Sequence, residues 1–328
     1  MFCYQRLSIC SLAILLVAPL ARAQQPQFRV PVRLVIAPTS VTDSHGRFIN
    51  GLTASDFMLY DNDVEQSIHY DADFLPISLA IAIQTNLVVE AAAPRIIELG
   101  PLLGSLVVGE GGEAAVLTFD RRVRVAQDFT GDLGRLTHTL RQIDFSYSDS
   151  HLIDATLQAI RLLKQRPAER RRILLLVAET RDQGSESELR DAVAEAELNN
   201  ILIYSLNISR AHAVGHAVTP VSIDPAALIK EIYSNAKNLV VENPLSVLTR
   251  YTGGRDYPFY KRGSLEEAIN KIGKEIHGQY LLSFASHTTD EDSYHAIRVT
   301  LKHGDYQVRS RPGYWPKAED YVSNSSTN

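Results

Sequence analysis

Four short apolar segments, separated by stretches with helical periodicity, constrain the fold of this chain more than any other feature. Each has the length of one strand and none alternates polar with apolar residues, so each is expected to be a strand buried on both faces. Buried strands that alternate with helices predict a doubly wound, mostly parallel α/β sheet with helices on both sides. The segments are Leu79 to Ile83, Glu113 to Phe119, Ile173 to Ala178 and Ile201 to Leu206.

The helices expected between these strands are visible in the spacing of apolar residues. Ala91 to Val107 has helical spacing, and a later helix has one apolar face made of Leu152, Ala155, Ala159 and Leu163. Ser185 and Glu188 have the spacing of a capping box, which predicts a helix start there. The stretch "RVRVAQDF" after the second strand predicts an edge hairpin, and Gly253-Gly254 predicts the end of a helix.

Segments with alternating apolar residues flank the α/β region on both sides and predict β structure there. They include Val30, Val32, Leu34 and Ile36 near the start and Tyr280, Leu282 and Phe284 near the end. Each flank is small for independent stability. We therefore expect residues 28–75 and the strands of residues 263–316 to share one β-sandwich, with residues 76–262 inserted in it and a helix from Ser264 connecting the two. Two separate β appendages on the α/β domain are the alternative.

Residues 1–23 have the pattern of a signal peptide. Arg6 precedes an apolar run from Leu7 to Leu20, and Ala21-Arg22-Ala23 has small residues at a cleavage site. We expect the mature chain to begin at Gln24 and to be secreted or periplasmic; an uncleaved N-terminal anchor is the alternative. Both cysteines, Cys3 and Cys10, lie in this segment, so the mature chain is expected to have no disulfide and no thiol nucleophile.

The overall charge indicates which partners to expect. The whole chain has a formal net charge of −5, and removal of the signal peptide makes it more negative. Such a charge gives no general attraction for nucleic acid or an anionic membrane, so neither is expected as a partner. No later apolar segment is long enough for a membrane span. Residues 317–328, rich in Ser and Asn, are expected to be a disordered tail.

Four further segments follow one another in an informative order: "VTDSHGRFINGLTASDFMLYDNDVEQSI", "AAVLTFDRRVRVAQDFTGDLGRL", "TGGRDYPF" and "QYLLSF…RVTLKHGDYQVRSRPGYW". In that order they resemble a von Willebrand factor type A (VWA) domain of a family of bacterial secreted proteins. The resemblance covers nearly the whole mature chain. It implies a Rossmann-like fold and a metal-ion-dependent adhesion site at the top of the sheet. The family builds that site from an Asp-x-Ser-x-Ser loop, a Thr and a final Asp.

In this chain every one of those positions has changed. The loop falls on Gln84, Asn86 and Val88, the Thr on Ser150 and the final Asp on Glu179. Mg²⁺ requires near-octahedral oxygen ligands and usually relies on one or two carboxylates. One carboxylate, two amides and a hydroxyl meet that need poorly. We therefore predict no metal and no other cofactor, and a polar platform that binds a protein partner by hydrogen bonds. The alternative is that these residues simply end a strand.

Other candidate residues carry weaker signals. His212 and His216 are four residues apart, but Gly215 and Pro220 argue against a helix, so they are expected to be exposed loop histidines. Asp61, Asp63 and Glu65 alternate like part of a calcium loop without its remaining ligands, which predicts solvated turn acids.

Two further groups of charged residues are expected to have structural and not functional roles. Asp149 and Asp154 lie near Ser150, and helix capping is the role expected for Asp154. Arg170-Arg171-Arg172 precede a strand and are expected to be solvated; three arginines are too few for a nucleic-acid site.

These observations leave three classes of function. The first is a non-catalytic extracytoplasmic protein-binding or adhesion module. The second, a structural subunit of a cell-envelope complex, shares every sequence feature with the first. The third is a hydrolase that uses Glu179 with His151 or Asp149, and it rests only on their expected proximity at the top of the sheet.

Overall fold

The computed structural model describes residues 33–70, 75–90, 92–145, 149–208, 243–258, 264–286 and 293–316, which belong to one compact unit beginning at Arg33. The predicted signal peptide, the histidines at 212 and 216 and the predicted C-terminal tail lie outside the described residues. Among the described residues, no helix is both long and apolar enough to cross a bilayer.

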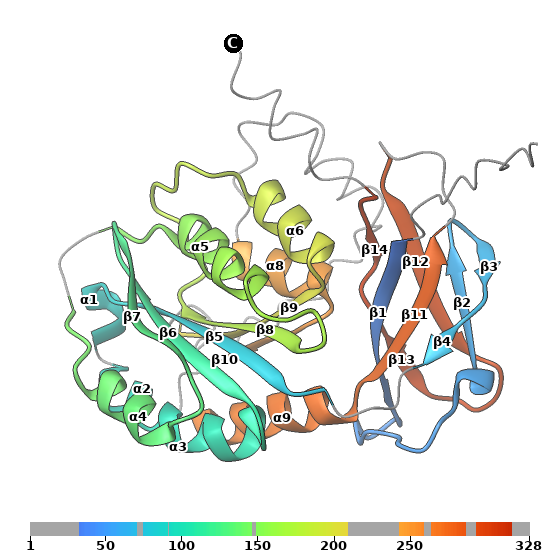
Figure 1. Ribbon diagram of the computed structural model, residues 1–328, viewed down its shortest axis with the longest axis horizontal. Coiled ribbons are helices and arrows are strands. Elements are labelled where there is room, and N and C mark those ends of the chain that lie inside the picture. The colour runs from blue at the N-terminus through green and yellow to red at the C-terminus, as the bar shows by residue number, and fades with distance from the viewer. Residues whose placement is uncertain are drawn as a thin grey trace, which may run out of the picture. The chain divides into compact units, whose positions relative to one another are not determined.

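A six-stranded sheet forms the centre of the α/β region, with strand order β10-β9-β8-β5-β6-β7 (Figure 1). Neighbouring strands from β10 to β6 pair in parallel, and β7 pairs antiparallel with β6 at one edge, as the hairpin pattern predicted. The doubly wound, mostly parallel fold expected from the sequence is therefore confirmed. The strands are β5 (Ile77–Gln84), β6 (Glu113–Phe119), β7 (Val123–Thr130), β8 (Arg171–Ala178), β9 (Ile201–Asn207) and β10 (Asp256–Pro258).

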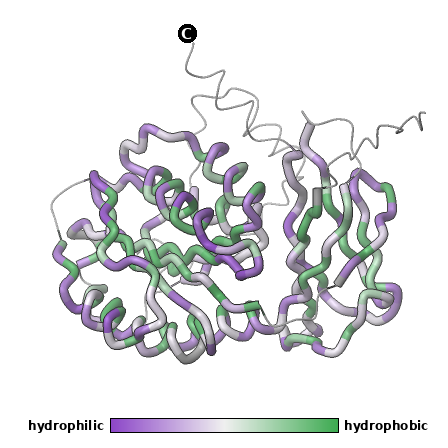
Figure 2. The backbone as a smooth tube through the Cα atoms, in the orientation of Figure 1, coloured by the Kyte–Doolittle hydropathy of each residue, from purple (hydrophilic) through white to green (hydrophobic). Residues whose placement is uncertain are grey.

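Helices pack on both faces of this sheet, and successive side chains of β5 alternate between them. Ile81 belongs to one apolar layer and Ala80 and Ala82 to the other (the apolar strands are green in Figure 2). One layer contains α2 (Ala93–Ile96), α3 (Leu99–Leu103), α4 (Leu133–Arg141) and α9 (Ser264–Gly278). The other contains α5 (Leu152–Lys164), α6 (Leu189–Leu198) and α8 (Pro244–Thr252). A short helix α1 (Leu87–Glu90) follows β5.

The continuous helical spacing of Ala91 to Val107 does not produce one helix. The segment forms α2, α3 and a π-helical turn from Gly104 to Val108. Pro101 explains the break before α3, because proline has no N–H for a helical hydrogen bond and is accepted only in a first turn. At Gly100 a Cβ would lie 2.6 Å from Thr137 Oγ1, so this glycine allows α3 to approach α4 closely.

Two four-stranded sheets, with orders β13-β1-β11-β4 and β14-β12-β2-β3, contain strands from both ends of the chain. Arg33 to Thr39 of β1 pairs antiparallel with Ser286 to Tyr280 of β11, and β2 pairs with β12. The flanks thus pair with each other, as the predicted fold requires; the exact domain boundaries stay a prediction. The strands are β1 (Arg33–Thr42), β2 (Phe57–Asp61), β3 (Val64–Gln66), β4 (His69–Tyr70), β11 (Tyr280–Ser286), β12 (His295–Leu301), β13 (Gln307–Arg309) and β14 (Gly313–Tyr314).

A buried carboxylate, Glu275 on α9, contacts elements of the α/β region and of the flanking β-sheets. Its side chain is fully buried and accepts hydrogen bonds from the hydroxyls of Tyr204 and Tyr257, each at 3.1 Å. Arg309 on β13 also donates to it, and Arg255 Nε lies 3.5 Å away. Burial raises the pKa of both tyrosines, and the negative charge of Glu275 adds to that effect. This cluster was not among the features predicted from the sequence.

The structure corrects the prediction that Arg170, Arg171 and Arg172 precede a strand and are solvated, because the last two are the first residues of β8 and all three are partly buried. Arg170 donates to Ser78 Oγ at 2.7 Å and to the carbonyls of Ile77 and Gly111. Arg171 donates to the Ile276 carbonyl and to Gln279 Oε1, so it links β8 to the end of α9. Carbonyls at the start of β5 and in the last turn of α9 lack partners within their own elements and accept from these guanidinium groups, and the sequence alone does not reveal such acceptors.

A second correction concerns Asp61, which was expected to be a solvated turn acid. It is 8% exposed and accepts hydrogen bonds from Tyr314 at 2.8 Å and from the ring of His295, whose Nδ1 lies 2.8 Å from Asp61 Oδ1. Asp63 and Glu65 do lie exposed around the turn. Period-two alternation explains the difference, since Asp61 ends β2 on its buried face.

Candidate functional site

The five residues at the positions of the adhesion site lie along the carboxyl-terminal edge of the central sheet. Gln84 is the last residue of β5, and Glu179 directly follows β8. Because β5 lies between β8 and β6 in the sheet, its end is flanked by both neighbours. Val88 is within α1, and its side chain lies outside the described atoms.

Gln84 and Glu179 bond to each other in both directions. The side-chain oxygen of Gln84 accepts the backbone N–H of Glu179 at 2.9 Å, and its Nε2 donates to Glu179 Oε2 at 3.3 Å. The Gln84 side chain is completely buried, whereas Glu179 is partly exposed. The parallel pairing of β5 with β8, in which Ile83 faces Val177, brings these two strand ends together. Each end of the Gln84 amide therefore already has a partner.

The segment that carries Ser150 crosses the end of β5. The Ser150 carbonyl accepts the N–H of Gln183, after β8, at 2.8 Å. The next residue, His151, donates its N–H to the carbonyl of Asp120, after β6, at 2.9 Å. Since β5 lies between these two strands, Ser150 is held above the residues that follow Gln84.

Two polar atoms at this edge are buried without a hydrogen-bond partner among the described residues. They are the Ser150 hydroxyl and the side-chain oxygen of Asn86, in residues that are 1% and 4% exposed. A buried polar group without a partner destabilises a fold by about 1–3 kcal/mol. Ser150 and Asn86 are therefore buried at this edge of the sheet, and each has a side-chain polar atom whose hydrogen-bonding capacity is unused among the described residues.

The start of α5 is capped by residues from the loop after β8, which corrects one sequence prediction. Ser185 Oγ accepts the N–H groups of Ile153 and Asp154, each at 3.1 Å, so Ser185 stabilises α5. It was expected to cap the following helix with Glu188. That helix, α6, begins after Glu188 without a side-chain cap. The capping-box spacing could not reveal that the serine serves a helix distant in sequence.

Asp154 supports the same loop in return, although it caps neither α5 nor α6, contrary to the expectation from the sequence. Its carboxylate accepts the N–H groups of Glu186 and Ser187 at 3.1 and 3.0 Å. Burial alone would raise the pKa of this carboxyl, but the hydrogen bonds from Ser187 and Glu186 and the nearby His151 outweigh it and lower the pKa. The loops on both sides of Ser150 and Glu179 are thus held by reciprocal bonds.

The donor set does not fit the Mg²⁺ ion that the family would place here. Both hydrogen-bonding ends of Gln84 are occupied by Glu179, and valine at position 88 has no donor atom. That leaves Asn86, Ser150 and one carboxylate, fewer charged ligands than Mg²⁺ usually needs. The described residues also contain no group of three or more His, Cys, Asp or Glu placed to hold a metal.

The residues suggested for a hydrolase are engaged in other contacts. The Glu179 carboxylate bonds to Gln84, and the ring of His151 faces Asp154, with Nδ1 at 3.4 Å from Oδ2. Asp149 is exposed and His151 is partly buried. The structure thus brings Glu179 to Gln84, and it pairs His151 with Asp154, the acid that holds the loop at Glu186 and Ser187.

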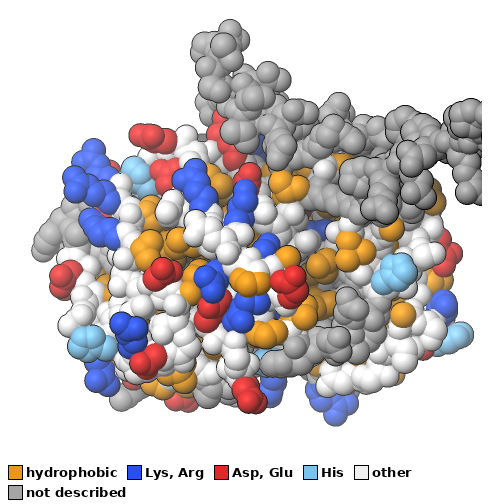
Figure 3. Space-filling model, in the orientation of Figure 1, with side chains coloured by type: hydrophobic (Ala, Val, Ile, Leu, Met, Phe, Trp, Pro, Cys, Tyr) orange, Lys and Arg blue, Asp and Glu red, His pale blue; other side chains and the backbone are white. Residues whose placement is uncertain are grey.

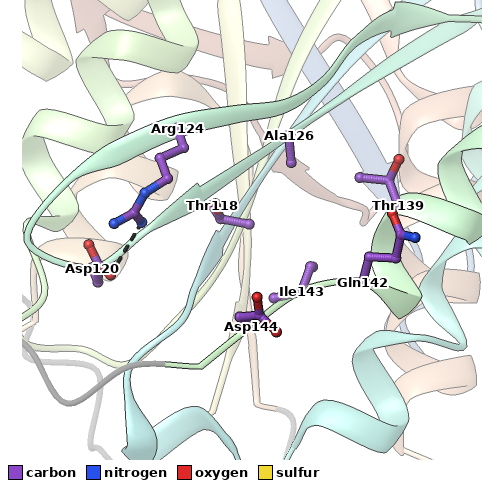
Figure 4. A pocket seen from close by; sticks show the side chains of 8 residues that line it. All are labelled: Thr118, Asp120, Arg124, Ala126, Thr139, Gln142, Ile143 and Asp144. Carbon is purple, nitrogen blue, oxygen red and sulfur yellow. Dashed lines mark hydrogen bonds and ion pairs between the residues drawn. The ribbon is translucent and has the colours of Figure 1, made fainter.

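A polar cavity of about 480 Å³ lies beside this edge, at the carboxyl end of β6 (Figure 4). Asp120 and Arg124 lie on one side of it, joined at 3.2 Å, and Thr139 and Gln142 lie on the other. Asp120 is 5% exposed and also accepts the N–H of Arg122 at 2.7 Å. Asp120 was not among the predicted site residues, although its position directly after a buried strand was a usable signal.

Comparisons with known proteins give likenesses of fold only. No protein-family profile matches the sequence, and no curated protein matches it either. The solved structures that the fold resembles include BatB from Bacteroides thetaiotaomicron, a conserved hypothetical protein, with 13% identity and a TM-score of 0.42 over 61% of this chain and 97% of that one. The VWA domain of SpRpn10 gives 11% identity and a TM-score of 0.40 over 60% and 95%.

A third similar structure is an aerotolerance-related membrane protein from Bacteroides fragilis NCTC 9343. It is 14% identical, with a TM-score of 0.41 over 61% of this chain and 99% of that one. One of the three is named a VWA domain. Scores at this level carry no functional conclusion, and the α/β fold class itself rests on the strand order of the chain.

Proposed function

We propose that this protein is an extracytoplasmic, non-catalytic protein-binding module. Its contact surface is the carboxyl-terminal edge of the central sheet, formed by Gln84, Asn86, Val88, Ser150 and Glu179, and it works without a metal. The observation that carries this proposal is the pair of hydrogen bonds between Gln84 and Glu179. They occupy side-chain atoms that a metal-dependent site would need for the ion.

Without a metal, affinity at this edge has to come from shape and hydrogen bonds. Asn86 and Ser150 each hold a buried polar atom without a partner among the described residues, and Glu179 is partly exposed beside them. A partner group that enters between these segments and bonds to both atoms relieves the penalty of leaving them unpaired. Glu179 supplies the acceptor that is reachable from the surface.

The extracytoplasmic location rests on the N-terminal sequence. Arg6, the apolar run after it and the small residues before Gln24 support export with cleavage after Ala23. On the face drawn in Figure 3, acidic and basic side chains are interspersed over the described surface. That distribution suits recognition of a particular protein surface better than attraction to a polyanion.

The test begins with the mature protein as bait in the exported fraction of its own cells, with captured proteins identified by mass spectrometry. The dissociation constant of the purified pair is then measured for Asn86→Ala and Ser150→Ala. Each is expected to weaken binding by roughly ten-fold, equivalent to about 1.4 kcal/mol. Ser44→Ala, an exposed serine in the β-sandwich, is the matched control and should leave affinity unchanged.

The same measurement in excess chelator separates this proposal from a metal-dependent site, because chelation is expected to change nothing. Partner binding that is unaffected by Gln84→Ala, Asn86→Ala and Ser150→Ala would move the interface away from this edge. Binding that disappears with chelator would show that a metal takes part.

A further inference from the structure

A second cavity, of about 840 Å³, lies between α8 and β10 on one side and β12, β13 and residues 310–312 on the other. We call it the arginine cavity, because five arginines line it, whereas Asp256 is the only acidic residue among its described lining. The chain as a whole is negative, with a net charge of −5, so this concentration of positive charge does not follow from composition. The five are Arg250, Arg255, Arg298, Arg309 and Arg311.

Three of these arginines have clear structural partners. Arg309 donates to the carbonyls of Gly253 and Gly254, at 3.0 and 2.7 Å, and to Glu275. Arg311 is 3% exposed and donates to the Glu197 carbonyl at 3.3 Å. Arg298 lies over the ring of Tyr60, 4.0 Å from its centre, and donates to Asp63 at 2.9 Å. These contacts fix the walls of the cavity.

The acidic residues near the cavity do not balance its positive charge. Asp256 directs its carboxylate at β9, where it accepts hydrogen bonds from Ser205 Oγ and from Asn207 Nδ2, the latter at 3.0 Å. Glu275 is fully buried and is shared by two guanidinium groups, those of Arg309 and Arg255. Asp63 pairs with Arg298, but the one carboxylate of Glu275 cannot neutralise both Arg309 and Arg255, so positive charge remains at the cavity.

The remaining charge is carried by two accessible side chains. Arg250 lies on the exposed face of α8, one turn after Ser246, and forms no ion pair within the described part of the chain. The side chain of Arg255 is 48% exposed, and its closest acidic contact is the 3.5 Å approach of Nε to Glu275. Both guanidinium groups therefore have donors available for a ligand.

We propose that the arginine cavity is a binding site for a small anion that carries two or more carboxylate or phosphate groups, held by Arg250 and Arg255. A guanidinium group forms paired, charge-assisted hydrogen bonds with either kind of oxyanion. The hydroxyl of Ser246, on the same face of α8, adds a neutral donor. The cavity volume is within the range of small-molecule sites, about 300–1,000 Å³. This site shares no lining residue with Gln84, Asn86, Val88, Ser150 and Glu179, and it does not depend on the function proposed for them.

The test is isothermal titration calorimetry of the mature protein with two probes, citrate and inorganic pyrophosphate, at constant ionic strength. The wild type is expected to bind at least one probe saturably, with one site per chain. Preference for citrate assigns a carboxylate ligand, and preference for pyrophosphate assigns a phosphate ligand. Arg250→Gln combined with Arg255→Gln is expected to weaken binding by roughly ten-fold or more.

Arg121→Gln is the matched control, because Arg121 is an exposed arginine between β6 and β7 and does not line the cavity. It should leave the dissociation constant unchanged. Arg250→Gln alone guards against a folding defect, since Arg250 has no ion-pair partner to lose among the described residues, and it should still weaken binding. The proposal is overturned if the wild type binds neither probe, or if the double variant binds as tightly as the wild type.

Discussion

Glu275→Ala is expected to destabilise the protein strongly while leaving the surface unchanged. The side chain is fully buried and accepts hydrogen bonds from Tyr204, Tyr257 and Arg309, which come from β9, β10 and β13. Alanine removes the carboxylate and leaves the Arg309 guanidinium, whose side chain is 30% exposed, without its acid. The substitution therefore removes the contact that joins α9 to β9 and β10 of the central sheet and to β13 of the flanking sheets.

The size of the effect follows from these partners. Removing one member of a buried ion pair destabilises a protein by roughly 3–5 kcal/mol, because the other charge is left uncompensated. The two tyrosine hydroxyls lose an acceptor as well, although Tyr204 still accepts a bond from Gln279 at 3.2 Å. Neighbouring losses do not simply add. We expect a decrease in unfolding free energy on the order of 4 kcal/mol.

Urea unfolding followed by circular dichroism at neutral pH measures this decrease. Glu267→Ala is the matched control, because Glu267 lies on the same helix and pairs with Lys271 at 2.6 Å while its side chain is 66% exposed. An exposed pair of this kind is screened by solvent and contributes little to stability. If Glu275→Ala loses no more stability than Glu267→Ala, the reasoning about the buried carboxylate is wrong.

Four shorter predictions follow from other contacts. Gln84→Leu leaves the N–H and the carboxylate of Glu179 without their hydrogen-bond partner. The unfolding free energy measured in urea should therefore fall by roughly 1–3 kcal/mol, and an unchanged value would contradict the pairing. The lowered pKa of Asp154, whose ordinary value is 3.8, contributes stability that disappears as pH falls through the folded-state pKa. Between about pH 5 and about pH 2 the wild type should therefore lose more stability than Asp154→Asn, and equal losses would refute this role. Gly254→Ala places a Cβ 1.9 Å from the Ile203 carbonyl oxygen, and its melting temperature should fall clearly. N-terminal sequencing of the exported protein should begin at Gln24, and a sequence that begins at Met1 would exclude cleavage.

The strands of the central sheet were predictable because they need little beyond local sequence. Leu79 to Ile83 and Ile173 to Ala178 are continuous apolar runs of strand length, and only burial on both faces suits them. The prediction of one helix over Ala91 to Val107 was wrong, because apolar spacing takes no account of a proline such as Pro101 within the segment. Glu275 lies three residues after Ile272 on the buried face of α9, a position that could have identified it as a buried acid.

The candidate site was predictable in position and less so in its bonding. Gln84 and Glu179 follow strands that were expected to be parallel, so their meeting at one edge followed from the fold class. Their mutual hydrogen bonds depend on the register between β5 and β8, which no local pattern specifies. Ser185 was assigned to the next helix because a local spacing cannot indicate a contact with a distant segment. Its partners lie at the start of α5.

The central claim, that the edge of the sheet works without a metal, is tested most directly by the melting temperature of the mature protein in chelator and in millimolar Mg²⁺ or Mn²⁺. A ligand raises the melting temperature only if it binds the folded state. We predict the same melting temperature in all three conditions for the wild type. A saturable increase with either ion that disappears in Glu179→Ala would contradict the account.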